Sequence, residues 1–204
     1  MHSVFISYHH DNDQEYKEAL FEVNGEGEER IFIDGSVDTG DISDNLSAEK
    51  IREKIRDEYL RDTSVTIVLV GSETKKRKHI DWEIYSSMFD GPVNKKSGIL
   101  VVILPSVDPD PLCKTAHDNE KVEIYPEYSN WVSIDNRAEY EKRYPYLSDR
   151  IIDNLLCKDA KISVVPWSKI ENNRGNLQFF INATFNDRVN CKYDMHREMM
   201  RQDL

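Results

Sequence analysis

Glu83, in the segment Asp-Trp-Glu-Ile at positions 81–84, is a candidate for chemistry because the loop after the third predicted strand leads into the helix that carries it. A carboxylate can orient the hydroxyl groups of a sugar and stabilise positive charge that develops as a bond breaks. Ser7 and Ser72 carry hydroxyl groups that could hydrogen-bond to the same substrate. The alternative interpretation of Glu83 is a solvated helix residue, which is the ordinary role of glutamate.

Short apolar segments alternate with helical patterns through the first half of the chain, in the order β-α-β-α-β-α-β. Such alternation predicts a parallel sheet with right-handed crossovers, whose ligands bind outside the carboxyl ends of the strands. The helix that carries Glu83 follows the third predicted strand, so Glu83 is expected near these strand ends. The predicted strands are residues 4–8, 30–34, 64–70 and 99–104, and the predicted helices end near 21, span 45–60 and begin near 80.

Local signals set the expected boundaries of these elements. The residues at 11–13, Asp-Asn-Asp, predict an N-cap for the first helix, and the glycine-rich residues 24–27 predict its end. The nearly continuous apolar run at 64–70 predicts a central strand, covered on both faces. A polar loop is expected over residues 34–41, including Thr39, Gly40 and Asp41.

The second half of the chain is harder to interpret. Residues 106–146 predict an irregular elaboration, 147–156 a helix and 162–165 a last parallel strand. Residues 177–184 fit either a strand or a helix. We expect one domain over residues 1–204, with a core at 1–105 and a C-terminal elaboration at 106–204.

Composition limits the classes of function. The formal net charge of −11 argues against broad nucleic-acid binding, so any anion must bind locally. The sequence has neither an apolar run of membrane-spanning length nor a recognisable signal peptide, which predicts a cytoplasmic protein without a membrane partner. Three widely spaced cysteines suggest neither disulfides nor zinc, and the residues at 9–13, His-His-Asp-Asn-Asp, lack a second cluster to complete a metal site.

Four segments occur in order: Val-Phe-Ile-Ser-Tyr-His at 4–9, Phe-Ile-Asp-Gly-Ser at 32–36, Val-Thr-Ile-Val-Leu-Val-Gly-Ser-Glu-Thr at 65–74, and Asp-Trp-Glu-Ile at 81–84. Together they resemble the TIR-like family that includes the Thoeris antiphage TIR proteins. The resemblance covers about the first 105 residues. It implies a flavodoxin-like fold and NAD⁺ cleavage, with Glu83 as the essential glutamate.

The expected chemistry agrees with a single carboxylate. Ordinary glycosidases need two, because their alkoxide leaving group must be protonated. Nicotinamide departs as a neutral molecule from a positively charged pyridinium, so no proton has to be delivered. Under this resemblance NAD⁺ is a substrate, and no cofactor or metal is expected. Residues expected to line the substrate pocket are Phe5, Ser7, Tyr8, His9, Ser72 and Trp82, with Asp34 and Ser36 in a loop that gates the pocket and mediates assembly.

Several of these residues have plainer interpretations. Phe5 and Trp82 are equally suited to core packing, and Asp34 and Ser36 to turn chemistry. The basic run at 75–78 could contact a pyrophosphate, but a solvated loop fits it better.

The resemblance predicts an enzyme that makes a cyclic or conjugated ADP-ribose signal after phage infection. A phage-derived activator, self-association and a separate nucleotide-sensing effector are the expected partners. The alternative is a noncatalytic TIR-type interaction module that acts as a scaffold. A phosphoacceptor receiver is excluded because the third strand ends in Val-Gly-Ser rather than in aspartate, and no glycine-rich phosphate loop indicates a dehydrogenase or NTPase.

Overall fold

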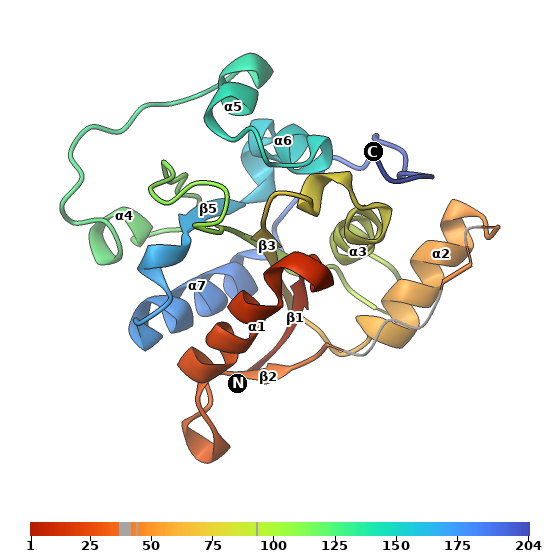
Figure 1. The fold of residues 1–204 in the computed structure, drawn as a ribbon, viewed down its shortest axis with the longest axis horizontal. Helices are drawn as coiled ribbons and strands as arrows, with labels where there is room; N and C mark the ends of the chain where they lie inside the picture. Colours follow the sequence, from red (N-terminus) through yellow and green to blue (C-terminus); the bar gives the residue numbers. More distant parts are fainter. Residues whose placement is uncertain (37–41, 44, 93) are drawn as a thin grey trace.

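The fold is taken from a computed structural model, which describes residues 1–36, 42–43, 45–92 and 94–204. Five parallel strands form one sheet in the order β2-β1-β3-β4-β5 (Figure 1). This confirms the predicted α/β, flavodoxin-like fold and the central position of β3. The strands are β1 (His2–Ser7), β2 (Phe32–Asp34), β3 (Val65–Val70), β4 (Gly98–Ile103) and β5 (Ser163–Pro166).

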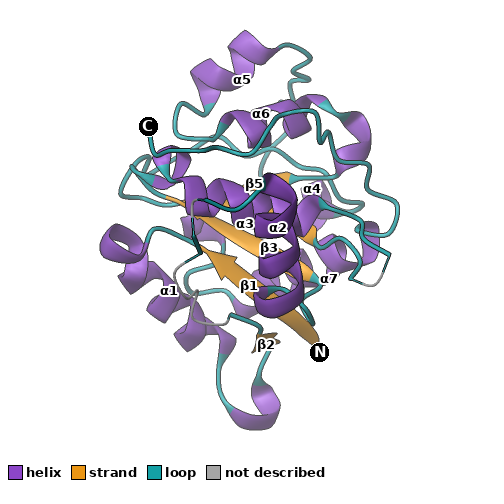
Figure 2. Ribbon diagram, turned by 90° about the vertical axis from the view of Figure 1, so that its right-hand side faces the viewer, coloured by secondary structure: helices purple, strands orange, loops and turns teal. Residues whose placement is uncertain are grey.

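The strand order changes direction between β1 and β3, whose arrows run the same way in Figure 2. In sheets of this order, that switch opens the crevice in which ligands bind. The helices that flank the sheet are α1 (His10–Asn24), α2 (Ala48–Lys54), α3 (Lys78–Met88), α4 (Glu120–Glu123), α5 (Arg137–Arg143), α6 (Asp149–Leu156) and α7 (Arg174–Asp187). Single turns of other helix types occur at Gly27–Glu29, Ile55–Tyr59, Thr74–Lys76, Lys158–Ala160 and Trp167–Lys169.

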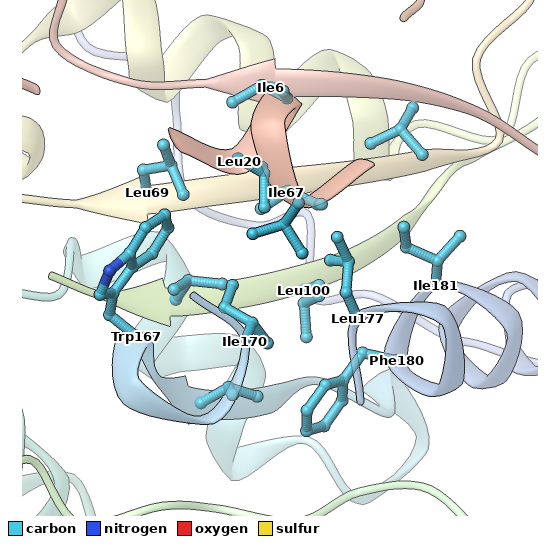
Figure 3. Close-up of a cluster of buried hydrophobic side chains, with 14 of the residues drawn as sticks. Ile6, Leu20, Ile67, Leu69, Leu100, Trp167, Ile170, Leu177, Phe180 and Ile181 are labelled. Carbon is cyan, nitrogen blue, oxygen red and sulfur yellow. The ribbon is translucent and has the colours of Figure 1, made fainter. Parts of the chain in front are cut away.

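One face of the sheet packs against α1 and α7. Figure 3 shows this cluster, in which Ile6, Ile67 and Leu100 of three neighbouring strands meet Leu20 of α1 and Phe180 of α7. All five side chains are buried. Shortening one such side chain to alanine typically costs about 2–5 kcal/mol, so this face contributes much of the stability of the sheet.

The opposite face is covered by α2, α3 and α6. Strand β1 alternates, so that Val4 and Ile6 face α1 while Phe5 joins the cluster of α2 and α3. On the β3–β4 side, Val68 packs with Ile84 of α3. This alternation decides which residues at the end of β1 can reach α3.

One local expectation is wrong, and another falls on residues that the structure does not describe. Residues 11–13 do not cap α1: the helix begins at His10, its N-cap residue is His9, and no side chain caps it. Asp11 and Asp13 instead lie in the first turn, where negative charge favours the helix dipole. The predicted loop residues Thr39, Gly40 and Asp41 lie outside the described residues.

The second half of the chain joins the same sheet. β5 pairs in parallel with β4, as predicted, and the segment 177–184 lies within helix α7 rather than in a strand. Only short helices and irregular segments occupy residues 106–146. Because β5 and α7 complete the sheet and its cover, we propose that residues 1–204 form one domain.

The C-terminal segment, residues 194–204, crosses back over α3 (Figure 1). The Asp203 carboxylate accepts hydrogen bonds from the backbone N–H of Lys78 (2.8 Å) and from the Arg77 guanidinium (3.2 Å). The N-cap residue of α3, Arg77, provides no side-chain cap of its own. A residue 125 positions away therefore caps this helix.

Candidate functional site

Ser7 and Glu83 meet where the end of β1 faces helix α3. The Ser7 hydroxyl donates a hydrogen bond of 2.6 Å to Oε2 of Glu83, across 76 residues of sequence. Ser7 is the last residue of β1, and strand alternation turns it toward α3, as it does Phe5. The contact lies at the carboxyl edge of the sheet, at the β1–β3 switch in strand order.

The Glu83 side chain is nearly covered. The residue is 7% exposed and Ser7 is 1% exposed. Burial raises the pKa of Glu83 to about 7, and the hydrogen bond from Ser7 opposes that rise. A carboxyl group with this pKa is present in comparable amounts as acid and as anion near neutral pH, and a pKa perturbed in this way is typical of functional sites.

Contacts from the second half of the chain fix the helix around Glu83. Asp81 forms a buried, two-bond ion pair with Arg150 of α6, with N–O distances of 2.7 and 3.0 Å. The backbone of Met200 contacts two successive residues: its N–H donates to Asp81 (2.9 Å), and its carbonyl accepts from the Trp82 indole (2.7 Å). The rotation of α3, and so the direction of Glu83, depends on these contacts.

Phe5 and Trp82 belong to the hydrophobic core. They are 3% and 1% exposed and pack in one cluster with Ile51 and Ile55. Both side chains support the two elements that bring Ser7 and Glu83 together. A direct contact of either ring with a substrate stays a prediction.

Tyr8 and His9 follow Ser7 but point elsewhere. Tyr8 packs on the α1 face of the sheet, where its hydroxyl donates to Gln14 (2.5 Å) and its ring stacks on His10. His9 is 8% exposed at the N-cap position of α1, and its Nδ1 atom has no hydrogen-bond partner among the described residues. The structure brings neither side chain to Glu83, and their binding roles stay predictions.

Asp34, the last residue of β2, and Ser36, in the loop after it, lie beside β1. Asp34 is exposed and accepts a hydrogen bond from the backbone N–H of Ser36 (2.8 Å). The Ser36 hydroxyl in turn accepts from the backbone N–H of Ile6 (3.4 Å), one residue before Ser7. Ser72 follows β3 and is exposed, and in the described part of the chain no hydrogen bond joins it to Glu83.

Asp13 is a second buried carboxylate at this edge, which the sequence analysis had assigned to helix capping. It is 1% exposed, and burial raises its pKa. Its carboxylate oxygens lie 2.3 and 2.4 Å from where a Cβ atom on Gly71 would be, so the glycine after β3 leaves the space that Asp13 occupies. The glycine at the end of a buried strand, Gly71, is the feature of the sequence that could have indicated this close approach.

The basic run at 75–78 is engaged by protein groups. Lys75 donates to the backbone carbonyl of Pro145, Lys76 pairs with Glu73 at 2.9 Å, and Arg77 pairs with Asp203. A pyrophosphate contact by this run is therefore not part of the site that we propose.

Among the described residues, no group of three or more His, Cys, Asp or Glu side chains could hold a metal ion. No described helix combines the length and apolar character needed to cross a bilayer.

Comparison with known proteins identifies one family. The model described as the Thoeris protein ThsB, TIR-like domain, matches residues 5–109, which is just over half of the chain. The match includes Ser7, Glu83, and all of β2, β3 and β4. No curated protein and no solved structure matches the chain.

Proposed function

The chain belongs to the family of the Thoeris protein ThsB, TIR-like domain, a family of TIR-type antiphage defence proteins, and from this we propose that it cleaves NAD⁺ with Glu83 as the catalytic carboxylate. The observation that carries the proposal is the buried Ser7–Glu83 hydrogen bond at the β1–β3 switch. The TIR match alone would fit a scaffold. A buried carboxylate with a raised pKa at the β1–β3 switch, where sheets of this order bind ligands, favours an enzyme.

In the proposed reaction, the Glu83 anion holds the hydroxyls of the nicotinamide-bearing ribose and stabilises the positive charge that grows as the glycosidic bond breaks. Nicotinamide takes the bonding electrons and leaves as a neutral base. The ribose carbon is then attacked by water or by another nucleophile, and exclusion of water favours a cyclic or conjugated ADP-ribose product. NAD⁺ is the substrate in this scheme, and no cofactor is required.

The 7% exposure of Glu83 supports a triggered enzyme, because the carboxylate must become accessible before NAD⁺ can reach it. We propose that a phage-derived activator promotes this change and that a separate effector senses the product. Ser7 positions the carboxylate, since its hydroxyl is the partner of Oε2 before substrate binds.

The test uses phage-infected bacteria that express wild-type protein, Glu83→Gln, Ser7→Ala or Glu49→Gln. Glu49 is an exposed glutamate of α2 and serves as the matched control. Mass spectrometry of NAD⁺, nicotinamide and ADP-ribose derivatives should show product formation in wild type and Glu49→Gln, less in Ser7→Ala and none in Glu83→Gln. Product formation by Glu83→Gln at the wild-type level would overturn the catalytic assignment.

A noncatalytic interaction module is the second candidate, and the edge of the sheet favours it. β2 is a three-residue edge strand, and Ile33 within it is 47% exposed. An exposed edge can pair with another copy of the chain. Self-association is proposed for either function, so Ile33→Lys should abolish defence in both cases. Only the scaffold predicts that defence survives Glu83→Gln.

A further inference from the structure

A cavity of about 320 Å³ in the C-terminal half is lined by three cations and by no carboxylate. The cations are Lys114, from the segment after β4, Lys121 of α4 and Arg143 at the end of α5. The chain as a whole carries a net charge of −11. A cavity with this lining in an acidic protein creates a local positive potential that attracts an anion.

Among the described residues, none of these three cations pairs with a carboxylate within 4.0 Å. The Lys114 ammonium donates to the backbone carbonyl of Ile162 at 2.7 Å, which leaves further N–H donors. Lys121 lies over the Trp131 ring, 4.6 Å from its centroid. Burial lowers the pKa of Lys114 to about 8, partly offset by the charge of Glu120.

The charge of Glu120 acts on Lys114, but its carboxylate is held by hydrogen bonds within the protein. The residue is fully buried, and its Oε2 atom accepts from the Ser163 hydroxyl (2.7 Å) and from the backbone N–H groups of Ala116 and His117. It is not among the residues that line the cavity.

The Tyr144 hydroxyl gives an independent indication of a ligand. Tyr144 is 3% exposed and lines the cavity, and its hydroxyl has no hydrogen-bond partner of good geometry among the described residues. A buried hydroxyl without a partner is costly unless a bound molecule or water satisfies it. Burial raises the pKa of Tyr144, and the nearby Arg143 charge opposes the rise, so the two groups lie close together.

A second cavity, of about 450 Å³, shares Trp131 and Arg143 with the first. Its wall includes Tyr128 and Leu112, and the rings of Tyr128 and Trp131 lie 6.1 Å apart. Trp131 lies in the segment that runs from α4 to α5 in Figure 1, and its indole donates to the Tyr128 carbonyl at 3.1 Å. The wall of this cavity also includes the carboxylates of Asp110 and Glu127, and the rings of Tyr128 and Trp131, inclined at 61°, offer aromatic surface for a ring system next to the cationic side.

We propose that these two cavities bind a nucleotide, with its phosphates among Lys114, Lys121 and Arg143 and its base against Trp131. The position is anchored by the rigid part of the fold: Lys114 exchanges backbone hydrogen bonds of 2.9 Å in both directions with Val164 of β5. Neither Ser7 nor Glu83 lines either cavity. The site is therefore separate from the proposed NAD⁺-cleaving site and does not depend on that proposal.

Isothermal titration calorimetry with ADP, pyrophosphate and adenosine tests the assignment. Wild-type protein should bind ADP at least about tenfold more tightly than either fragment, since only ADP uses both sides. Arg143→Gln and Lys121→Gln should each weaken ADP binding about tenfold, as expected from loss of a charge-assisted contact. Lys142→Gln, an exposed neighbour on α5 that lines neither cavity, should bind as wild type does.

Variants at the two sites separate the possible outcomes. Ser7→Ala should keep full ADP affinity, and Trp131→Leu should reduce ADP affinity to that of pyrophosphate. Equal affinity of wild type for ADP and pyrophosphate, undetectable ADP binding, or binding lost in Ser7→Ala and kept in Arg143→Gln would each overturn the proposal. If Arg143→Gln disturbs folding, Lys121→Gln still tests the site, because Lys121 is exposed and its substitution should leave the fold intact.

Discussion

At the scale of single residues, the ionisation of Glu83 works against folding. Its pKa in the folded protein is about 7, against a usual value of 4.5. Between these values the folded chain binds more protons than the unfolded chain, so stability falls as pH rises from about 4.5 to 7. Above pH 7 the full penalty is present.

Glu83→Gln should therefore stabilise the protein at alkaline pH, because glutamine keeps the shape and cannot ionise. We expect a gain of up to about 3 kcal/mol at pH 8 and a smaller gain at pH 5, with loss of the proposed activity. Urea denaturation at the two pH values measures the difference. A gain that is the same at both would show that ionisation is not its cause.

The pH dependence of the proposed NAD⁺ cleavage follows from the same group. If the anion is the active form, nicotinamide release by the triggered enzyme should rise with pH, with a midpoint between the usual 4.5 and the value of about 7 in the buried state, because triggering exposes the carboxylate. The Ser7 hydrogen bond lowers this pKa, so the midpoint of residual activity in Ser7→Ala should move to higher pH. Initial rates between about pH 5.5 and 8.5 provide the measurement, and a midpoint that moves down or stays fixed contradicts it.

The sequence predicts that Ser7 and Glu83 lie close together, because parallel strands end at a common edge of the sheet. The structure places the two side chains in hydrogen-bond contact. The grouping of Ser7 with Tyr8 was less sound. Successive residues of a strand face opposite sides, so only one of the two could reach α3, and the period of two was already visible in the sequence. Their proposed roles in catalysis and binding are still to be measured.

At the scale of elements, α3 is fixed by an ion pair that a reader of the sequence could not have matched. Asp81 and Arg150 lie 69 residues apart, and local patterns carry no information about such a pair. For residues 177–184 the sequence leaves a strand and a helix open, because a short apolar run fits either one. Packing over β1, β3 and β4 selects the helix α7.

Arg150→Met should cost about 3–5 kcal/mol, because it leaves the Asp81 carboxylate buried with its cation removed. Combining it with Asp81→Asn should recover much of the loss. Lys192→Met serves as the control, since its ammonium pairs with Asp159 at the exposed surface. Denaturation midpoints of wild type and of the three variants test this, and a double variant no more stable than Arg150→Met contradicts the ion-pair explanation.

At the scale of the whole molecule, the two halves of the chain depend on each other. β5 completes the sheet that the first half begins, and residues 194–204 contact α3 at Asp81, Trp82 and Lys78. The family match stops at residue 109, so β5 and residues 194–204 lie outside the matched region.

Removal of residues 196–204 should loosen α3 and leave the sheet intact. The change takes away the Met200 contacts and the Asp203 cap, whereas the cluster under α1 and α7 keeps its residues. Hydrogen exchange followed by mass spectrometry should show faster exchange in α3, with α7 unchanged as an internal reference. Unchanged protection of α3 would show that the segment is not needed to hold the helix.

The carbonyl group of Met200, which accepts the hydrogen bond of the Trp82 indole, lies 118 residues later in the chain. During synthesis on the ribosome, α3 emerges long before that partner exists, so a nascent chain can build most of its sheet while the helix that carries Glu83 is still unclamped. If the chain cleaves NAD⁺ as proposed, an incomplete translation product should be inactive, because it lacks the residues that set the angle of its own carboxylate.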